Sequence, residues 1–245
     1  MGAAETRSRI LDFAEKLFAA QGFHGTTLRE VALAADLRQS LVQYHFKSKF
    51  ELFRAVYERR ALPINHDRMT RLADIEAKAA RGNPLDPEEI VRAFVESTVV
   101  TARDRKSGGE PYAEIVAQII NDPQDHARKV SREFMDVVAK NTLRVLRAAL
   151  PDIASDELVW CYVFSIGAMV SAIARTGRVR LLSEGECDPD DVERILSLLV
   201  PFITGGMDAV AKSSKARRPA LKRKSPARNT EVARPPHALS RRVKV

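Results

Sequence analysis

Side chains suited to binding nucleic acid gather in a short stretch of the chain, between residues 27 and 49. Gln39 and Ser40 stand at the start of an expected short helix, where short polar side chains reach base edges, and glutamine pairs well with adenine N6 and N7. Thr27 opens another expected helix, and the free backbone amides of a helix N-terminus bind phosphate. Hydroxyl, imidazole and ammonium donors suited to backbone phosphates follow at Tyr44, His45, Lys47 and Lys49. These residue types and spacings predict a DNA-binding surface.

Some residues of this stretch admit two interpretations. Arg29, one turn into the first of the two helices, is either a DNA contact or a solvated surface charge. Tyr44 is either a phosphate contact, which we favour, or a core aromatic, which is what we expect of Phe46. Leu37 and Leu41 are expected to face inward and to hold the angle between the two helices.

The formal charge of +8 is distributed unevenly along the 245 residues. Residues 1–60 hold 10 Lys/Arg against 7 Asp/Glu, residues 61–211 hold 18 against 24, and residues 212–245 hold 12 against 1. A mildly basic head, an acidic body and a strongly basic tail suggest that the two ends of the chain, and not its middle, meet a polyanion. The tail also combines prolines with few large apolar residues, so we expect it to be disordered.

The sequence carries no signature of catalysis, metal binding or cofactor binding. It contains no H-E-x-x-H, G-x-S-x-G, P-loop or G-x-G-x-x-G pattern. The histidines are scattered, and Cys161 and Cys187 lack a partner at zinc-like spacing. We therefore expect no enzyme activity, metal or cofactor. Two cysteines and an N-terminus without the features of a signal peptide fit a cytoplasmic protein.

One uncharged run, residues 158–174, is just long enough to cross a bilayer. Ser165, Gly167 and Ser171 interrupt it, and charged residues close both of its ends. We expect a buried helix or an oligomer interface here and no membrane span.

The fold is expected to be all-α, because Ala, Leu, Arg and Glu dominate and apolar residues recur at a spacing of three and four. Thr27 and Glu30 match a capping box, and Ser48 is expected to cap a longer helix that Pro63 bends or ends. Further helices are expected at about residues 5–21, 28–34, 39–45, 87–105, 111–120, 123–150, 155–176 and 189–211, the last kinked by Pro201. The pair at 28–34 and 39–45 has the size of a helix-turn-helix unit, whose second helix lies in a major groove.

Between about Thr6 and Arg59 a series of residues occurs in a specific order: Ile10-Leu11-Asp12-Phe13-Ala14, Leu17-Phe18, Gly22-Phe23, Thr26-Thr27, Val31-Ala32, Ala35, Tyr44-His45-Phe46-Lys47-Ser48-Lys49 and Leu52-Phe53. With these residues the segment resembles the tetracycline-repressor (TetR) family of helix-turn-helix transcriptional regulators. Three positions depart from the family pattern. Asp36 stands at the usual turn glycine, Arg38 at the usual Ser or Thr cap, and Gln43 at a frequent Tyr. Aspartate tolerates a left-handed backbone better than most residues, so we expect the turn to survive.

The resemblance and the helix pattern together divide the chain into three parts. Residues 1–54 are expected to form a three-helix DNA-binding domain, residues 55–211 a helical ligand-binding and dimerisation domain, and residues 212–245 the disordered basic tail. The expected DNA contacts are Thr27, Arg29, Arg38, Gln39, Ser40, Gln43, Tyr44, His45, Lys47 and Lys49.

A second copy of the chain is expected, because a single helix-turn-helix reads few bases and two recognition helices must meet successive major grooves about 34–36 Å apart. The helix at 155–176 is apolar nearly all round, which calls for burial on two sides. In the resembled family the last two helices form a four-helix dimer bundle. The expected interface residues, which could instead form only an internal core, are Met169, Ile173, Ile195, Leu199, Phe202 and Ile203.

The resemblance also implies a small-molecule pocket in the body, whose occupation changes the separation of the two heads. The large apolar side chains available to line it, each of which could also be an ordinary core residue, are Phe94, Tyr112, Phe134, Met135, Trp160 and Phe164. An apolar wall suits a lipophilic effector.

The leading hypothesis is therefore a homodimeric, sequence-specific regulator of transcription that represses from a palindromic DNA operator until a small effector releases it. The alternative is a sequence-tolerant DNA-binding or compacting protein driven by its basic tail.

Overall fold

The regular elements of the described chain are all helical, as the sequence predicts. The computed structural model describes residues 2–104 and 108–222, with side chains as far as residue 216. The elements are α1 (Ala3–Gly25), α2 (Leu28–Ala34), α3 (Gln39–His45), α4 (Lys49–Ala80), α5 (Pro87–Arg103), α6 (Gly109–Asn121), α7 (Asp125–Val130), the π-helical turn η1 (Ser131–Met135), α8 (Asp136–Ala149), α9 (Ser155–Ile173), α10 (Arg178–Leu182) and α11 (Val192–Lys222).

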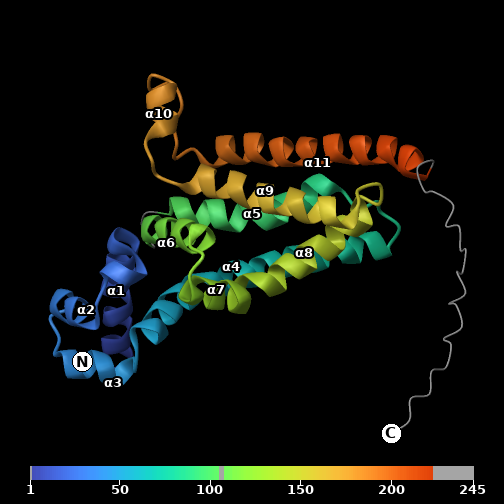
Figure 1. Cartoon of the computed structure of the whole chain (residues 1–245). Coiled ribbons are helices and arrows are strands. Elements are labelled where there is room, and N and C mark those ends of the chain that lie inside the picture. The colour runs from blue at the N-terminus through green and yellow to red at the C-terminus, as the bar shows by residue number, and fades with distance from the viewer. Residues whose placement is uncertain (1, 105–107, 223–245) are drawn as a thin grey trace, which may run out of the picture.

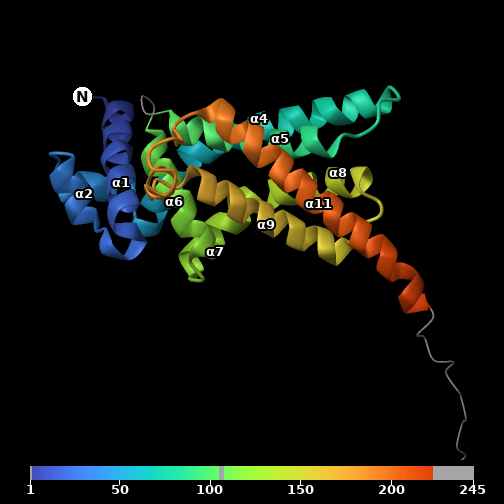
Figure 2. The ribbon, with the colours of Figure 1, turned by 90° about the horizontal axis from the view of Figure 1, so that it is seen from above.

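The molecule consists of a small head and an elongated body (Figure 1). Helices α1, α2 and α3 form the head at one end, and α4 leads from the head into the body. There α5 packs on α4, α6, α8 and α9, while α11 lies along α5 and α9. Seen from above, α11 runs obliquely across the body and its C-terminal end lies far from the head (Figure 2).

Side-chain caps begin the helices that place the head. The Thr27 hydroxyl accepts a hydrogen bond from the Glu30 backbone N–H at 3.2 Å, and the Glu30 carboxylate accepts one from the Thr27 N–H at 2.8 Å. The Ser48 hydroxyl accepts from the Glu51 N–H at 3.1 Å and starts α4. Each cap satisfies backbone donors that have no partner inside their helix. The predicted starts of α2 and α4 are confirmed.

Two residues with a left-handed backbone set the bends of the head. Gly22 has φ 71° and interrupts α1 before its last three residues. Asp36 has φ 52° in the turn between α2 and α3, as expected for an aspartate at a position that usually requires glycine. Its side chain is exposed and lies 3.9 Å from Arg9.

The head has its own apolar centre, which includes Val42 of α3 and Phe46, the residue that follows the end of α3; both are buried. Phe18 of α1 packs edge-on against Phe53 of α4, with ring centroids 5.0 Å apart. Burial of each such side chain contributes roughly 1.5–3 kcal/mol. Burial of Val42 within the helix and of Phe46 directly after it fixes the position and the rotation of α3.

A cluster of ion pairs joins the head to α4. The Glu15 carboxylate, buried on α1, accepts a hydrogen bond from Arg60 Nε at 2.8 Å and pairs with Arg59. Arg59 also pairs with Asp12. Both arginines lie in the first half of α4, so this cluster joins α1 to the helix that enters the body.

Several expected boundaries differ from the structure. The single helix expected at 123–150 is divided into α7, η1 and α8, and α10 was not expected. Pro123 and Pro189 precede helices instead of lying in their first turns, since α11 begins after Asp191, whose carboxylate accepts from the Arg194 N–H at 2.9 Å. Pro63 lies inside α4 and does not end it.

The expected start of the disordered tail at residue 212 is wrong, because α11 continues to Lys222. Alanine, lysine and arginine dominate this part of the chain, and all three favour helix. Ser214 is buried, and Lys215 pairs with Asp152 at 3.2 Å, so the body supports the extension. The rest of the expected tail, residues 223–245, lies outside the described residues.

Replacing Asp36 with glycine is expected to stabilise the head by up to about 1 kcal/mol, because a left-handed backbone is unfavourable for a residue with a Cβ atom. The exposed pairing with Arg9 contributes little and is a small loss. Urea unfolding followed by circular dichroism measures the change. The control is Asp36→Ala, which removes the same carboxylate but keeps the Cβ atom and should destabilise. Equal stabilities of the two variants would contradict the backbone argument.

Candidate DNA-binding surface and effector region

The outer face of α3 carries the polar side chains expected to read DNA. Gln39, Ser40 and Gln43 are exposed, and Tyr44 is 79% exposed. Val42, on the opposite side of the helix, is fully buried. The interpretation of Tyr44 as a core aromatic is therefore wrong, and its hydroxyl is available to a partner.

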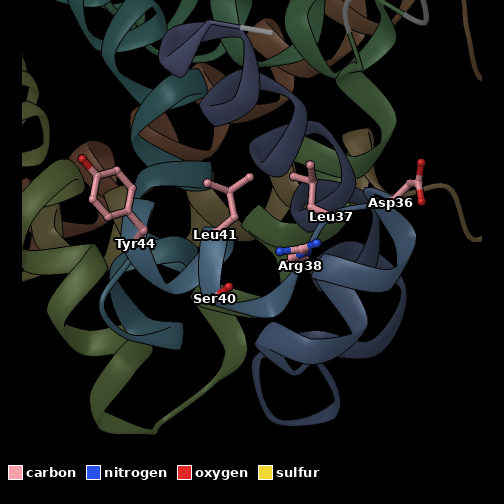
Figure 3. Close-up of a pocket in the computed structure, with 6 residues that line it drawn as sticks. All are labelled: Asp36, Leu37, Arg38, Ser40, Leu41 and Tyr44. Atoms are coloured by element: carbon pink, nitrogen blue, oxygen red, sulfur yellow. The ribbon is translucent and has the colours of Figure 1, made fainter.

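Leu41 departs from its predicted inward orientation, since it is 36% exposed. With Val42 and Phe46 on the inner face, the neighbouring position is turned about 100° away from the core. Leu37 packs partly buried against the core, as predicted. Figure 3 shows Leu41 between Tyr44 and Leu37, among the side chains that line a hollow: Asp36, Leu37, Arg38, Ser40, Leu41 and Tyr44. An apolar side chain beside polar ones can contact a thymine methyl group.

Three exposed cations surround α3 without an ion pair inside the described chain. They are Arg29 on α2, Arg38 at the start of α3, and Lys47 after its end. Exposed cations of this kind can neutralise phosphates without an internal competitor. Arg29 therefore remains a candidate for either of its two interpretations.

Lys49 and His45 are less available than the sequence suggests. Lys49 is half-buried, its Nζ lies 3.5 Å from the His24 carbonyl oxygen, and it sits 4.6 Å above the Phe23 ring. His45 is also half-buried. The ammonium of Lys49 thus already has partners at the end of α1, which gives this residue a structural role.

The N-terminus of α2 holds a carboxylate of its own chain. The Thr27 hydroxyl also donates to the Glu30 carboxylate at 2.8 Å. A phosphate that approaches this helix end has to lie beside the Glu30 charge, which interacts favourably with the same helix dipole.

The head meets the body a second time at the end of α1. Phe23 stacks on His126 of α7 with centroids 4.0 Å apart, and His24 Nε2 lies 2.7 Å from the Gln124 side-chain oxygen. Gln118 of α6 donates to the Ala19 carbonyl at 2.8 Å. Burial lowers the pKa of His126, and the nearby Asp122 carboxylate partly opposes this effect. The head therefore contacts the body through α6 and α7 as well as through α4.

The body contains a cluster of buried aromatic side chains that includes half of the predicted effector contacts. Phe94 lies 5.1 Å from Tyr162, and Tyr57 lies 6.2 Å from Tyr112 and 5.6 Å from Phe134 between ring centroids. All five rings are buried. The predicted contact Met135 is partly buried beside them.

Two predicted effector contacts lie elsewhere. Trp160 is 61% exposed and Phe164 is 66% exposed on the outer face of α9. The inner face of this helix is occupied by Leu158, Tyr162 and Ser165. Because α9 is apolar nearly all round, the sequence gives no sign of which face packs inward. The structure therefore places Trp160 and Phe164 on the surface of the body, away from the buried aromatic cluster.

Arg68 of α4, which the sequence analysis missed, points into the same aromatic cluster. Its Nη2 donates to the Thr98 hydroxyl at 2.5 Å, and its guanidinium lies 4.9 Å from the Phe94 ring centroid. The signal that could have found it is helical spacing, because Arg68 falls between Ile64 and Leu72 on the buried stripe of α4.

The predicted dimer residues mostly pack inside their own chain. Met169, Ile173, Leu199 and Ile203 are buried and Ile195 is half-buried, whereas Phe202 is 72% exposed. The apolar side chains that α9 and α11 leave exposed are different ones. We call them the outer strip, and its members are Val159, Trp160, Val163, Phe164, Leu198 and Phe202.

By length and apolar composition alone, two helices of the described chain could cross a membrane. They are α9 and residues 192–216 of α11. Both pack against α5 in the body, so their inner faces form part of its core. No group of three or more potential metal-binding side chains occurs among the residues that the structure describes.

The compact pair α2 and α3, with an exposed polar second helix, defines a helix-turn-helix protein of the DNA-binding class. Comparison with models of protein families identifies the family. Residues 10–56 match the family model of bacterial regulatory proteins of the tetR family, and residues 92–206 match the tetracyclin repressor-like C-terminal domain. The chain belongs to the tetR family.

Curated relatives are themselves regulators. The chain is 34% identical over 107 residues to the HTH-type transcriptional regulator AcrR of Shigella flexneri, a match of 42% of this chain and 46% of AcrR. It is 30% identical over 119 residues to the HTH-type transcriptional repressor BepR of Brucella suis, covering 49% and 51%. The chain thus spans about half the length of the curated relatives it matches.

Solved structures share the fold over most of the chain. A TetR-like transcriptional regulator from Rhodococcus sp. RHA1 superposes with a TM-score of 0.59 at 19% identity, covering 85% of this chain and 98% of that one. HlyIIR, a hemolysin II transcriptional regulator, gives 0.54 at 17% identity, covering 81% and 99%. At these identities the likeness concerns the fold.

Changing Gln39 to alanine is expected to relax the preference at one base step by about 1–3 kcal/mol, because an exposed amide at the start of α3 can pair with one base. Changing Lys47 to alanine should weaken binding to all sequences alike and lower the slope of log K against log salt by about 0.9. Fluorescence anisotropy with a selected site and its single-base variants measures both effects. An unchanged base preference in Gln39→Ala would remove this residue from the reading set.

Proposed function

We propose that the protein is a homodimeric, cytoplasmic repressor that binds a palindromic operator through α3 of each protomer and releases it when a small lipophilic effector occupies the body. The observation that carries the proposal is the exposed polar face of α3, presented by buried Val42 and Phe46 on a head joined to the body. The similarity to BepR, a transcriptional repressor, favours repression over activation.

In this proposal residues 1–54 bind DNA, and residues 55–211 hold the effector and the second protomer. Gln39 and Ser40 contact base edges, with Arg38, Gln43 and Tyr44 beside them on the same surface. Arg29 and Lys47 neutralise phosphates, and Thr27 offers the N-terminus of α2. Lys49 and His45 support the end of α3 from a partly buried position.

The outer strip is the proposed contact with the second copy. Its side chains follow one face of α9 and one face of α11, which lie side by side. Gly167, Gly205 and Gly206 are exposed beside them and allow close approach of helices. A twofold axis brings the same strip of both protomers together, so an exposed apolar surface is covered without a second kind of partner.

The proposed function is tested by selecting bound sites from genomic DNA and measuring affinity for the selected site and for random DNA at physiological salt. A sequence-specific regulator should prefer its site by roughly 10³ to 10⁷. A promoter fused to the site should be silenced by the protein in a reporter assay. Similar affinities for both DNAs would refute the proposal and favour the sequence-tolerant alternative.

Phe202→Glu is expected to convert the dimer into a monomer at micromolar concentration while its helix content stays the same, because an unpaired charge is then buried at the interface. Light scattering and circular dichroism measure the two properties. The matched control is Val137→Glu, which places the same charge on an exposed apolar position of α8. A wild-type monomer, with or without operator DNA, would contradict the dimer.

A further inference from the structure

Arg68 occupies a position in the body where apolar residues are the rule. It lies on the inward stripe of α4, four residues after Ile64 and four before Leu72, both of which are buried. Its neighbours come from two other helices, since Nη2 donates to Thr98 of α5 and lies 3.8 Å from the sulfur of Met169 on α9. A permanently charged group thus stands at the junction of three helices.

This guanidinium has no negative partner in the described chain. Its Nε is buried and makes no hydrogen bond, and no carboxylate lies within ion-pair distance. The nearby ionisable groups are tyrosines, and burial raises the pKa of Tyr57 and Tyr112, and that of Tyr162 to about 12. The three phenols are therefore neutral at physiological pH and do not offset the charge.

The other arginines of α4 have the acidic partners that Arg68 lacks. Arg54 pairs with Glu133 and Glu58, Arg60 with Glu15, and Arg71 with Asp67 and Glu96. A buried cation is normally paired and hydrogen-bonded, because desolvation without compensation is costly. Arg68 is half-buried, its buried Nε makes no hydrogen bond, and no carboxylate of the described chain pairs with it, so its charge is uncompensated.

We propose that Arg68 binds the carboxylate of an amphipathic effector whose apolar part packs among Phe94, Tyr112 and Phe134, an inference that rests on the effector-controlled function proposed above. The fork of N–H donors on a guanidinium matches the two oxygens of a carboxylate. The surrounding rings provide the apolar wall that a lipophilic chain requires. A cationic lipophile is disfavoured, because it brings a second positive charge to the same place.

The experiment uses three probes that share a ten-carbon chain: decanoate, 1-decanol and decyltrimethylammonium. Calorimetric titration of the full chain, below the micelle concentration of each probe, should give saturable decanoate binding at least about tenfold tighter than binding of the other two. In Arg68→Met the decanoate affinity should fall at least tenfold while decanol affinity changes little. Arg68→Lys should keep part of the preference, because it keeps the charge but loses the fork.

The matched control is Arg147→Met, which removes the same charge from an exposed position of α8 and should leave all three affinities unchanged. The thermal midpoint of each variant shows that it is folded. Absence of saturable decanoate binding, or a preference for decanoate that survives in Arg68→Met, overturns the inference.

Operator binding is measured on the same samples. A protein that selects its operator but ignores decanoate refutes the Arg68 site alone. A protein without operator preference refutes the proposed function, whatever it does with decanoate. Release of operator by decanoate in the wild type, and its loss in Arg68→Met, supports both.

Discussion

The carboxylate of Glu15 is buried between α1 and α4, where Arg59 and Arg60 both pair with it. This contact helps to set the position of the head relative to the body, together with the packing of α1 on α4 and on α6. The orientation of the polar face of α3 therefore depends on the orientation of α4. A change in the body can reach the DNA-reading surface through α4, through the packing of α1 on α6, or through the contact of Phe23 with His126.

The arginines of α4 differ in whether an acidic side chain compensates their charge. Those near the head and at the surface are compensated by acids of α1, α4, α5 and η1, and they hold elements together. Arg68 alone among them faces an apolar cluster with only a hydroxyl and a thioether as partners. Paired arginines of α4 therefore hold elements together on both sides of Arg68, whose own charge has no acidic partner among the described residues.

The head could be predicted well from the sequence, because its determinants are local. Thr27, Glu30 and Ser48 mark helix starts through their own hydrogen bonds, and Asp36 occupies a turn whose backbone it tolerates. The body could be predicted only as a set of helices. Helix α9 is apolar nearly all round and has no periodicity that separates a core face from an outer face. The sequence therefore does not show that Trp160 faces outward and Met169 inward, as they do in the structure. Arg68 could have been found, since the stripe around it is periodic.

Pro63 gives α4 a mechanical property. A proline has no N–H to donate, so the carbonyl of Arg59 lacks its partner one turn on, and the helix is most easily bent at this point. Pro63 lies three residues after Arg60, which pairs with Glu15 of the head, and five residues before Arg68. The 14 residues from Lys49 to Leu62 span about 20 Å at 1.5 Å each, so a bend of 10° at the proline would swing the end that carries the head by about 3 to 4 Å. That displacement is close to the 3.4 Å rise of one base pair. A bend of α4 at Pro63 would therefore move the head as a lever moves about its pivot.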